Sequence, residues 1–223
     1  MADHEPNVLI IGATGSVGRE LVRLYTADGA RVHAVGRNPE HLAAVATATG
    51  AHTYPVDLSG PEGAAETAEI LREQQISVAI ASVGGWYVAE PGLQLPMSTW
   101  TSTIESNLTA HFVAARAFAP VLQGDRPVYL ALNGIACHYP CEGSIAISVA
   151  GVGQRMMLDV LAAEGRHQPT TFAELVVDTP IVVPGGPAQD DEPVSTVEQV
   201  YEAIRALVSG PAAPGTVARA HLG

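Results

Sequence analysis

The chain opens on an apolar run, residues 7–11, which is followed by a glycine turn and then by an amphipathic stretch from Arg19. A short apolar run flanked by turn residues predicts a buried parallel strand. The three glycines of the turn are Gly12, Gly15 and Gly18. Such a turn lets the backbone approach a pyrophosphate closely, and the helix N-terminus offers it free N–H groups. The pattern predicts dinucleotide binding, and a tight strand–helix turn without a ligand is the simpler alternative.

Apolar runs and helical patterns then alternate to the end of the chain. Further strands are predicted at 31–35, 52–56, 76–81, 127–132, 171–177 and 216–221. Helices are predicted at 19–28, 40–49, 59–73, 98–120, 145–164 and 195–209. Pro55 favours an edge position for its strand, because proline lacks the backbone N–H that a central strand uses. The alternation predicts one α/β domain over residues 1–223: a Rossmann-type, doubly wound parallel sheet of about seven strands in three α/β/α layers.

Several local features refine these elements. Asn38 is expected to cap the helix that follows it, and Ser195 with Glu198 has the spacing of a capping box. The segment 182–193 is predicted to be an open, mobile loop. The long helix 98–120 is expected to turn one apolar face to the core, formed by Ile104, Leu108, Phe112 and Ala115.

The composition narrows the class of protein. Of 223 residues, 47% are hydrophobic and 15% are charged, which suits a sheet buried on both faces. The net charge of −12 argues against nucleic-acid and anionic-membrane partners. The polar start and the expected absence of an apolar segment of membrane length predict a cytoplasmic protein. Cys137 and Cys141 flank His138, but their spacing matches no usual zinc pattern, so no metal site is expected.

The end of the second strand bears on the choice of dinucleotide. A protein that binds NAD would carry Asp or Glu there to hold the ribose hydroxyls. This chain has Gly36 and Arg37 instead. An arginine favours a 2′-phosphate, so NADP is the expected cofactor and NAD the alternative. A solvated loop arginine would explain Arg37 as well.

Five short motifs together resemble the short-chain dehydrogenase/reductase family over nearly the whole chain. They are the glycine turn, Asp57-Leu58 after the third strand, Ser82-Val83-Gly84 after the fourth, the helix segment 107–112 with Pro120, and Thr179-Pro180 after the sixth. Ser82 stands where the family usually has asparagine. With the turn and Arg37, the resemblance implies these dinucleotide contacts: Gly12, Thr14, Gly15, Ser16, Val17, Gly18, Arg37, Asn38, Asp57, Leu58, Ser82, Val83, Gly84, Thr179 and Ile181.

The chain departs from this family at its catalytic centre. The family uses a Tyr-x-x-x-Lys pair on the helix after the fifth strand, and alignment puts Ile145 and Val149 at those places. All eleven basic residues are arginines, so no other alignment restores the lysine. The family's serine falls at Asn133 or Gly134. Substitute catalytic groups are expected among Asn107, Asn133, His138 and Tyr139, although a turn, lid or solvent-facing role explains each of them too.

The resemblance also implies a substrate region and an assembly. Trp86, Tyr87 and Met97 lie where the family forms its pocket, which suggests a small apolar or aromatic substrate, although core packing explains them equally well. Small residues on the helices 98–120 and 145–164 predict a homodimer or homotetramer. The leading interpretation is an NADP(H)-dependent reductase of a small carbonyl compound, with non-standard or substrate-assisted proton donation. The alternatives are a cyclase, dehydratase or isomerase on the same fold, and a dinucleotide-sensing or interaction protein without turnover.

Overall fold

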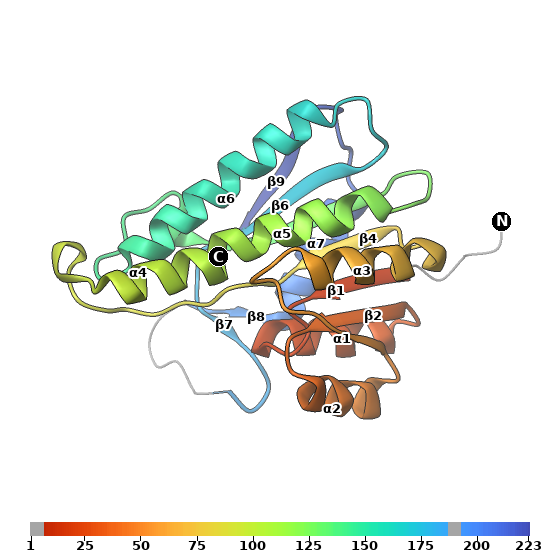
Figure 1. The fold of residues 1–223 in the computed structure, drawn as a ribbon, viewed down its shortest axis with the longest axis horizontal. Helices are drawn as coiled ribbons and strands as arrows, with labels where there is room; N and C mark the ends of the chain where they lie inside the picture. Colours follow the sequence, from red (N-terminus) through yellow and green to blue (C-terminus); the bar gives the residue numbers. More distant parts are fainter. Residues whose placement is uncertain (1–6, 187–192) are drawn as a thin grey trace.

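The computed structural model describes residues 7–186 and 193–223, which form three layers around one parallel sheet (Figure 1). Seven strands lie in the order β3-β2-β1-β4-β5-β6-β9, and every neighbouring pair is parallel. The order changes direction at β1, so the crevice between the ends of β1 and β4 is the switch point where ligands of such sheets bind. The strands are β1 (Asn7–Ile11), β2 (Arg31–Gly36), β3 (His52–Pro55), β4 (Val78–Ala81), β5 (Val128–Gly134), β6 (Thr171–Val177) and β9 (Val217–Leu222).

Helices cover both faces of this sheet because strand side chains alternate between two apolar cores. Leu9 and Ile11 enter one core, and Val8 and Ile10 enter the other. The second core receives α1 (Ser16–Ala27), α2 (Pro39–Thr49) and α7 (Val197–Ser209). The first receives α3 (Glu62–Leu71), α5 (Ala110–Phe118) and α6 (Ile145–Glu164). The predicted doubly wound fold is thereby confirmed.

The predicted helix 98–120 is divided into four parts. α4 (Met97–Ile104) runs into a π-helical turn, η3 (Glu105–Thr109), before α5 and a closing 3-10 turn, η4 (Ala119–Val121). The wider turn rotates all later side chains relative to those of α4. Phe112 is therefore 46% exposed, while Val113 and Phe118 are buried. The predicted apolar face through Phe112 is wrong for this reason.

Of the two caps predicted at helix starts, one is confirmed and the other lies one residue later. Asn38 caps α2, accepting hydrogen bonds from the backbone of Glu40 and His41. The capping box of α7, however, joins Thr196 to Gln199, one residue later than predicted. Ser195 belongs instead to a small second sheet, in which β7 (Ile181–Val182) pairs with β8 (Ser195–Thr196). Part of the predicted loop 182–193 lies outside the described residues.

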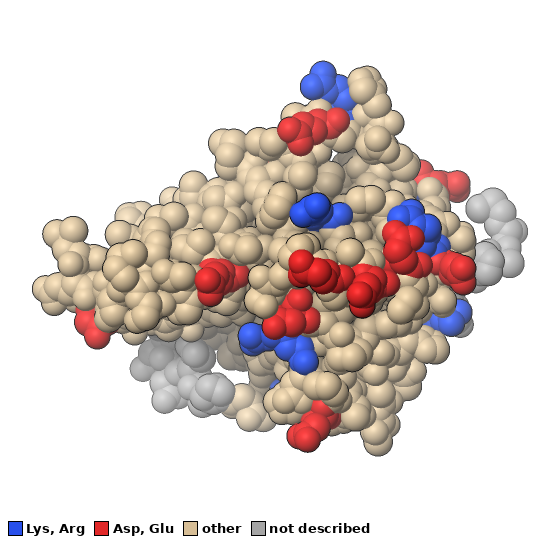
Figure 2. All heavy atoms as spheres, viewed as in Figure 1, with Lys and Arg blue, Asp and Glu red and all other residues tan. Residues whose placement is uncertain are grey.

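Among the described residues, α6 is long and apolar enough to cross a membrane by length and composition, with a mean hydropathy of 1.4 over its most apolar window. This corrects the expectation that no segment reaches that length. One face of α6 packs over the sheet, and 39% of that window is buried inside the protein. The face in Figure 2 shows few charged side chains over α4 and α6.

Candidate functional site

A groove crosses the carboxyl edge of the sheet at the switch point. It consists of two adjoining cavities of about 590 and 850 Å3, a size typical of ligand pockets. One cavity extends toward the ends of β2 and β3, and the other toward the ends of β5 and β6. The residues that line both are Gly15, Ser82, Val83, Gly84, Gly85, Trp86 and Asn107. An elongated ligand can therefore cross the sheet edge without interruption.

The three glycines of the turn have different roles. Gly12 has φ +84°, and a Cβ there would lie 2.0 Å from the carbonyl oxygen of Ser82; a Cβ on Gly18 would lie 2.2 Å from that of Gly12. These two glycines let β1, β4 and α1 pack together. A Cβ on Gly15 would meet one atom within 4 Å, the Gly12 carbonyl oxygen at 3.3 Å, and otherwise enters the groove. Gly15 thus keeps the space above the α1 N-terminus free for a ligand.

The cavity near β2 and β3 carries the residues expected around an adenosine. Arg37, Asp57 and Leu58 line it, together with Gly12 and Thr14. The backbone N–H of Ser59 donates to Asp57 Oδ1 at 3.0 Å, and the hydrogen bonds from Ser59 hold the pKa of Asp57 below its ordinary value. Asp57 is therefore an ionised acceptor at neutral pH.

Not every expected contact reaches the groove. Asn38 uses its side-chain oxygen as the cap of α2, and Gly18 is buried in the turn. His41 in the first turn of α2, which the sequence did not single out, also lines the cavity. Of the expected contacts at the other end, Ser16, Val17, Thr179 and Ile181 line the second cavity.

The π-helical turn holds the loop after β4 in place. Asn107 Nδ2 donates to the Gly85 carbonyl at 2.7 Å, and His111 Nε2 lies 3.2 Å from the Val83 carbonyl oxygen. Gly84 has φ +92°, and a Cβ there would lie 2.9 Å from Asn107 Cγ. Burial lowers the pKa of His111 to about 4, so its imidazole is neutral at physiological pH and can donate from Nε2. Asn107 therefore shapes the groove wall from its central position in η3.

The helix α6 presents an apolar wall to the second cavity. Ile147 and Gly151, four residues apart on one helix face, line it, with Gln154 one turn further on. Ile145 and Val149 are 41% and 43% exposed and do not line the described cavities. From α6, Ile147 and Gly151 therefore face the cavity, whereas Ile145 and Val149, at the places predicted for the tyrosine–lysine pair, do not. The groove lacks that pair at either set of positions.

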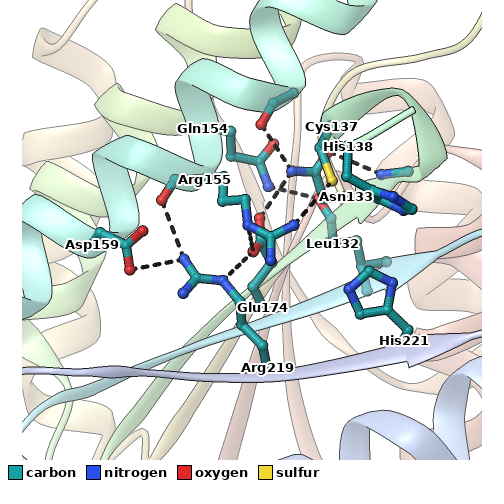
Figure 3. A network of polar contacts seen from close by, with 12 residues as sticks. Leu132, Asn133, Cys137, His138, Gln154, Arg155, Asp159, Glu174, Arg219 and His221 are labelled. Carbon is teal, nitrogen blue, oxygen red and sulfur yellow. Dashed lines mark hydrogen bonds and ion pairs between the residues drawn. The ribbon is translucent and has the colours of Figure 1, made fainter. Parts of the chain in front are cut away.

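Asn133 lines the cavity, but its amide belongs to a buried polar network (Figure 3). Its Nδ2 donates to Glu174 Oε1 at 2.9 Å and to the Gly151 carbonyl at 3.0 Å, while its Oδ1 accepts from the Gly134 N–H. Glu174 is fully buried and lies opposite Arg219, whose Nε donates to Oε2 at 2.7 Å. The side chain of Asn133 thus has hydrogen-bond partners within the protein, which argues against its predicted catalytic role.

The other two expected catalytic residues lie outside the described groove lining. Tyr139 is 60% exposed. His138 Nε2 lies 2.7 Å from Asp178 Oδ1. Of these two residues, Asp178 lines the cavity and His138 does not.

The residues expected to form a substrate pocket differ in position. Trp86 lines both cavities, and Met97 lines neither. Tyr87 lines one cavity, and its hydroxyl shares a hydrogen bond with that of Thr103. Ile147, Gly151, Gln154 and Asp178 also line the cavity and were not predicted. Small and apolar residues such as Gly151 and Ile147 carry no chemical signal in a sequence, and Gln154 and Asp178 reach the groove only through the fold.

Comparisons with known proteins agree with this geometry. A family model described as short chain dehydrogenase matches residues 6–179. A serine 3-dehydrogenase from Rhizobium radiobacter is 24% identical over 140 residues, which cover 61% of this chain and 56% of that protein, so the chain spans just over half the length of this relative.

Solved structures extend the likeness in fold to nearly the whole chain. A short-chain type dehydrogenase/reductase from Mycobacterium ulcerans superimposes with a TM-score of 0.83 at 16% identity, covering 99% of this chain and 90% of that one. The structure of BdcA in complex with NADPH gives a TM-score of 0.79 at 19% identity, covering 97% and 93%. At these identities the likeness establishes the fold.

Proposed function

The chain belongs to the short chain dehydrogenase family, and on this basis we propose that it binds NADP(H) and reduces a small carbonyl compound. The observation that carries the proposal is the groove, which runs unbroken from Arg37 and Asp57 at one end to Thr179 and Ile181 at the other. Gly15 and the α1 N-terminus lie at its middle, where a pyrophosphate would be held by backbone N–H groups and the helix dipole. BdcA, which shares the fold, was solved with NADPH.

The preference for NADP rests on Arg37. It follows β2 directly and lines the adenosine end of the groove, where no carboxylate stands at the strand end. A guanidinium can bond a 2′-phosphate through two N–H groups at once, an interaction that NAD cannot make. Asp57 is left to accept hydrogen bonds from the adenosine side.

The reduction itself requires little from the protein's side chains. Bound NADPH supplies the hydride, and the chain contributes binding, orientation and the exclusion of water. Ile147, Gly151 and Trp86 offer an apolar site for the substrate, which supports a small apolar or aromatic carbonyl compound. Because the wall of α6 provides no acid, we propose that the proton comes from solvent or from a neighbouring hydroxyl of the substrate.

The same wall favours a second candidate function. A groove that binds a dinucleotide but offers no tyrosine–lysine pair suits a protein that senses the cofactor without turning it over. The two functions differ in one outcome: a reductase consumes NADPH in the presence of its carbonyl substrate, and a sensor binds NADPH and leaves it unchanged.

A carbonyl screen distinguishes these functions. The purified full-length chain is mixed with NADPH and a panel of aliphatic, alicyclic and aromatic ketones, aldehydes and quinones, and the loss of NADPH absorbance is followed. We expect oxidation with at least one member, and its loss in Gly15→Trp, whose side chain would fill the pyrophosphate position. NADPH binding without oxidation across the panel would favour the sensor, and turnover that survives Gly15→Trp would indicate a reaction that does not use this groove.

A further inference from the structure

Three metal-ligating side chains meet beside the groove at the carboxyl edge of β6 and β9. His138 Nε2 lies 2.7 Å from Asp178 Oδ1, and His221 Nδ1 lies 2.8 Å from Asp178 Oδ2. One ligand atom from each of the three residues can be chosen so that all lie within 4.8 Å of one another. The two imidazole rings are 4.9 Å apart between centroids, and Figure 3 shows them close together.

Backbone hydrogen bonds hold all three residues where they meet. His138 ends the 3-10 turn η5 (Ile135–Cys137), and its N–H donates to the Ile135 carbonyl. Asp178 follows β6, and its N–H donates to the Leu222 carbonyl at 2.8 Å. His221 lies in β9, opposite Val176 in the parallel ladder. The backbone of three separate segments therefore brings the three side chains together.

We propose that His138, Asp178 and His221 bind a divalent transition-metal cation of the zinc class. Two imidazoles and one carboxylate form a common protein ligand set for such ions, with water in the remaining position. The side chains of His138 and His221 are 37% and 43% exposed, so an ion and its water can reach them. Mg2+ and Ca2+ prefer oxygen ligands, so these cations are expected to bind poorly.

The hydrogen bonds of the metal-free chain are compatible with this site. A neutral imidazole that donates one N–H to Asp178 can move that proton to its other ring nitrogen and present a lone pair to the ion. A zinc ion holds nitrogen and oxygen ligands at about 2.0–2.2 Å, which places the ligand atoms about 3.3 Å from one another. To reach that spacing, the two histidine nitrogens, now within 4.8 Å of each other, move closer together and slightly away from the Asp178 oxygens at 2.7 and 2.8 Å.

The proposed ion would fasten the last strand of the sheet to the segment after β5. Asp178 also lines the second cavity, so the ion would lie at the edge of the groove. The proposal departs from the sequence expectation of no metal site, and it does not use Cys137 or Cys141. It also stands independently of dinucleotide binding.

Zinc titration of the full-length, chelator-treated chain tests the proposal. Calorimetry with Zn2+ alone is expected to give one site per chain, and thermal unfolding is expected to shift upward with added Zn2+. His221→Gln and His138→Gln should each weaken binding at least about tenfold. Cys141→Ser and His167→Gln, which alter a thiol and a histidine outside the cluster, should leave it unchanged.

Circular dichroism verifies that each variant is folded. If a variant does not fold, the titration of the wild-type chain still tests the proposal. Absence of Zn2+ binding to the wild-type chain would overturn the proposal. The cluster would then only join its three segments through hydrogen bonds. Zn2+ binding that is lost in Cys141→Ser, or retained in both histidine variants, would assign the ion to other ligands and equally overturn it.

Discussion

At the end of β2, Arg37 lines the cavity in which the proposed dinucleotide would place its adenosine. We expect Arg37→Glu to weaken NADPH binding by at least about tenfold, because it replaces a charge-assisted contact by repulsion of the 2′-phosphate. NADH binding should change much less. Fluorescence titration with both nucleotides measures the two affinities.

Arg166→Glu makes the same change of charge at an exposed arginine outside the described groove and serves as the control. Equal losses for NADPH and NADH in Arg37→Glu would mean that Arg37 does not read the 2′-phosphate. A loss of the same size in Arg166→Glu would mean that the effect comes from the change in net charge and not from a contact made by Arg37.

His111 is the second residue whose surroundings give a measurable prediction. Burial lowers its pKa to about 4 in the folded chain, whereas an unfolded histidine titrates near 6.5. Between these values the unfolded chain binds a proton that folded His111 does not, so the free energy of unfolding falls as the pH falls from about 6.5 to about 4. His111 alone is expected to contribute up to about 1.4 kcal/mol per pH unit to this change in the free energy of unfolding.

Denaturant unfolding across this pH range measures the slope. His111→Gln should flatten it, while His167→Gln, at an exposed position, should not. His33, whose pKa burial also lowers to about 4, continues to contribute in both variants. A pH dependence that is the same in His111→Gln as in the wild type would contradict the account of a buried, neutral imidazole.

At the scale of elements, Glu174 joins β6 to β9 and α6. Its carboxylate meets Arg219 at 2.7 Å and Arg155 at 3.8 Å, and Arg219 also meets Asp159 at 2.9 Å. Glu174→Gln leaves the two arginines around an uncharged amide, and losing one member of a buried ion pair costs about 3 kcal/mol or more. We therefore expect a clear fall in the free energy of unfolding.

Chemical denaturation measures this change, with Glu69→Gln as the control because Glu69 and Arg72 form an exposed ion pair on and beside α3. Removing an exposed ion pair changes stability little. If Glu174→Gln were as stable as the wild type, the network would not hold the three elements together.

The outer face of α6 supports the predicted homodimer or homotetramer. Val152, Met156 and Val160 are 53%, 61% and 46% exposed, and Phe112 of α5 is similarly exposed. A stripe of this kind is typical of a face that packs against a second copy. We expect Met156→Glu to shift the chain to monomer in sedimentation velocity, and Ile70→Glu, an exposed apolar residue of α3, to leave the assembly intact. A monomeric wild-type chain would contradict the prediction.

The elements that the sequence predicted correctly are those with strong local signals. The buried strands, the glycine turn and the cap at Asn38 each depend on neighbouring residues. The π-helical turn around Asn107 could not be predicted, because the contact that accompanies it, to the Gly85 carbonyl, is made by a segment 22 residues away in sequence. Which residues of α6 face the cavity could not be predicted either, because Ile147 and Gly151 do so only through the packing of α6 on the sheet.

Most residues predicted for the cofactor end line the groove, whereas of those predicted for the catalytic end only Asn107 and Asn133 do. The glycine spacing and Arg37 indicate a chemical role even when only the sequence is known. Asn133 and His138, by contrast, are polar residues whose partners, Glu174 and Asp178, lie about forty residues away. Only the fold shows that these partners already form hydrogen bonds with the two side chains.

At the scale of the whole molecule, the groove proposed to hold a dinucleotide is joined to an apolar wall that lacks the tyrosine–lysine pair. The central claim is that this groove binds NADP(H), and calorimetric titration of the wild-type chain with NADPH and with NADH tests it most directly. NADPH is predicted to bind one per chain and at least about tenfold more tightly than NADH, the difference expected from one charge-assisted contact to the 2′-phosphate. No binding of either nucleotide, or tighter binding of NADH, would contradict the claim.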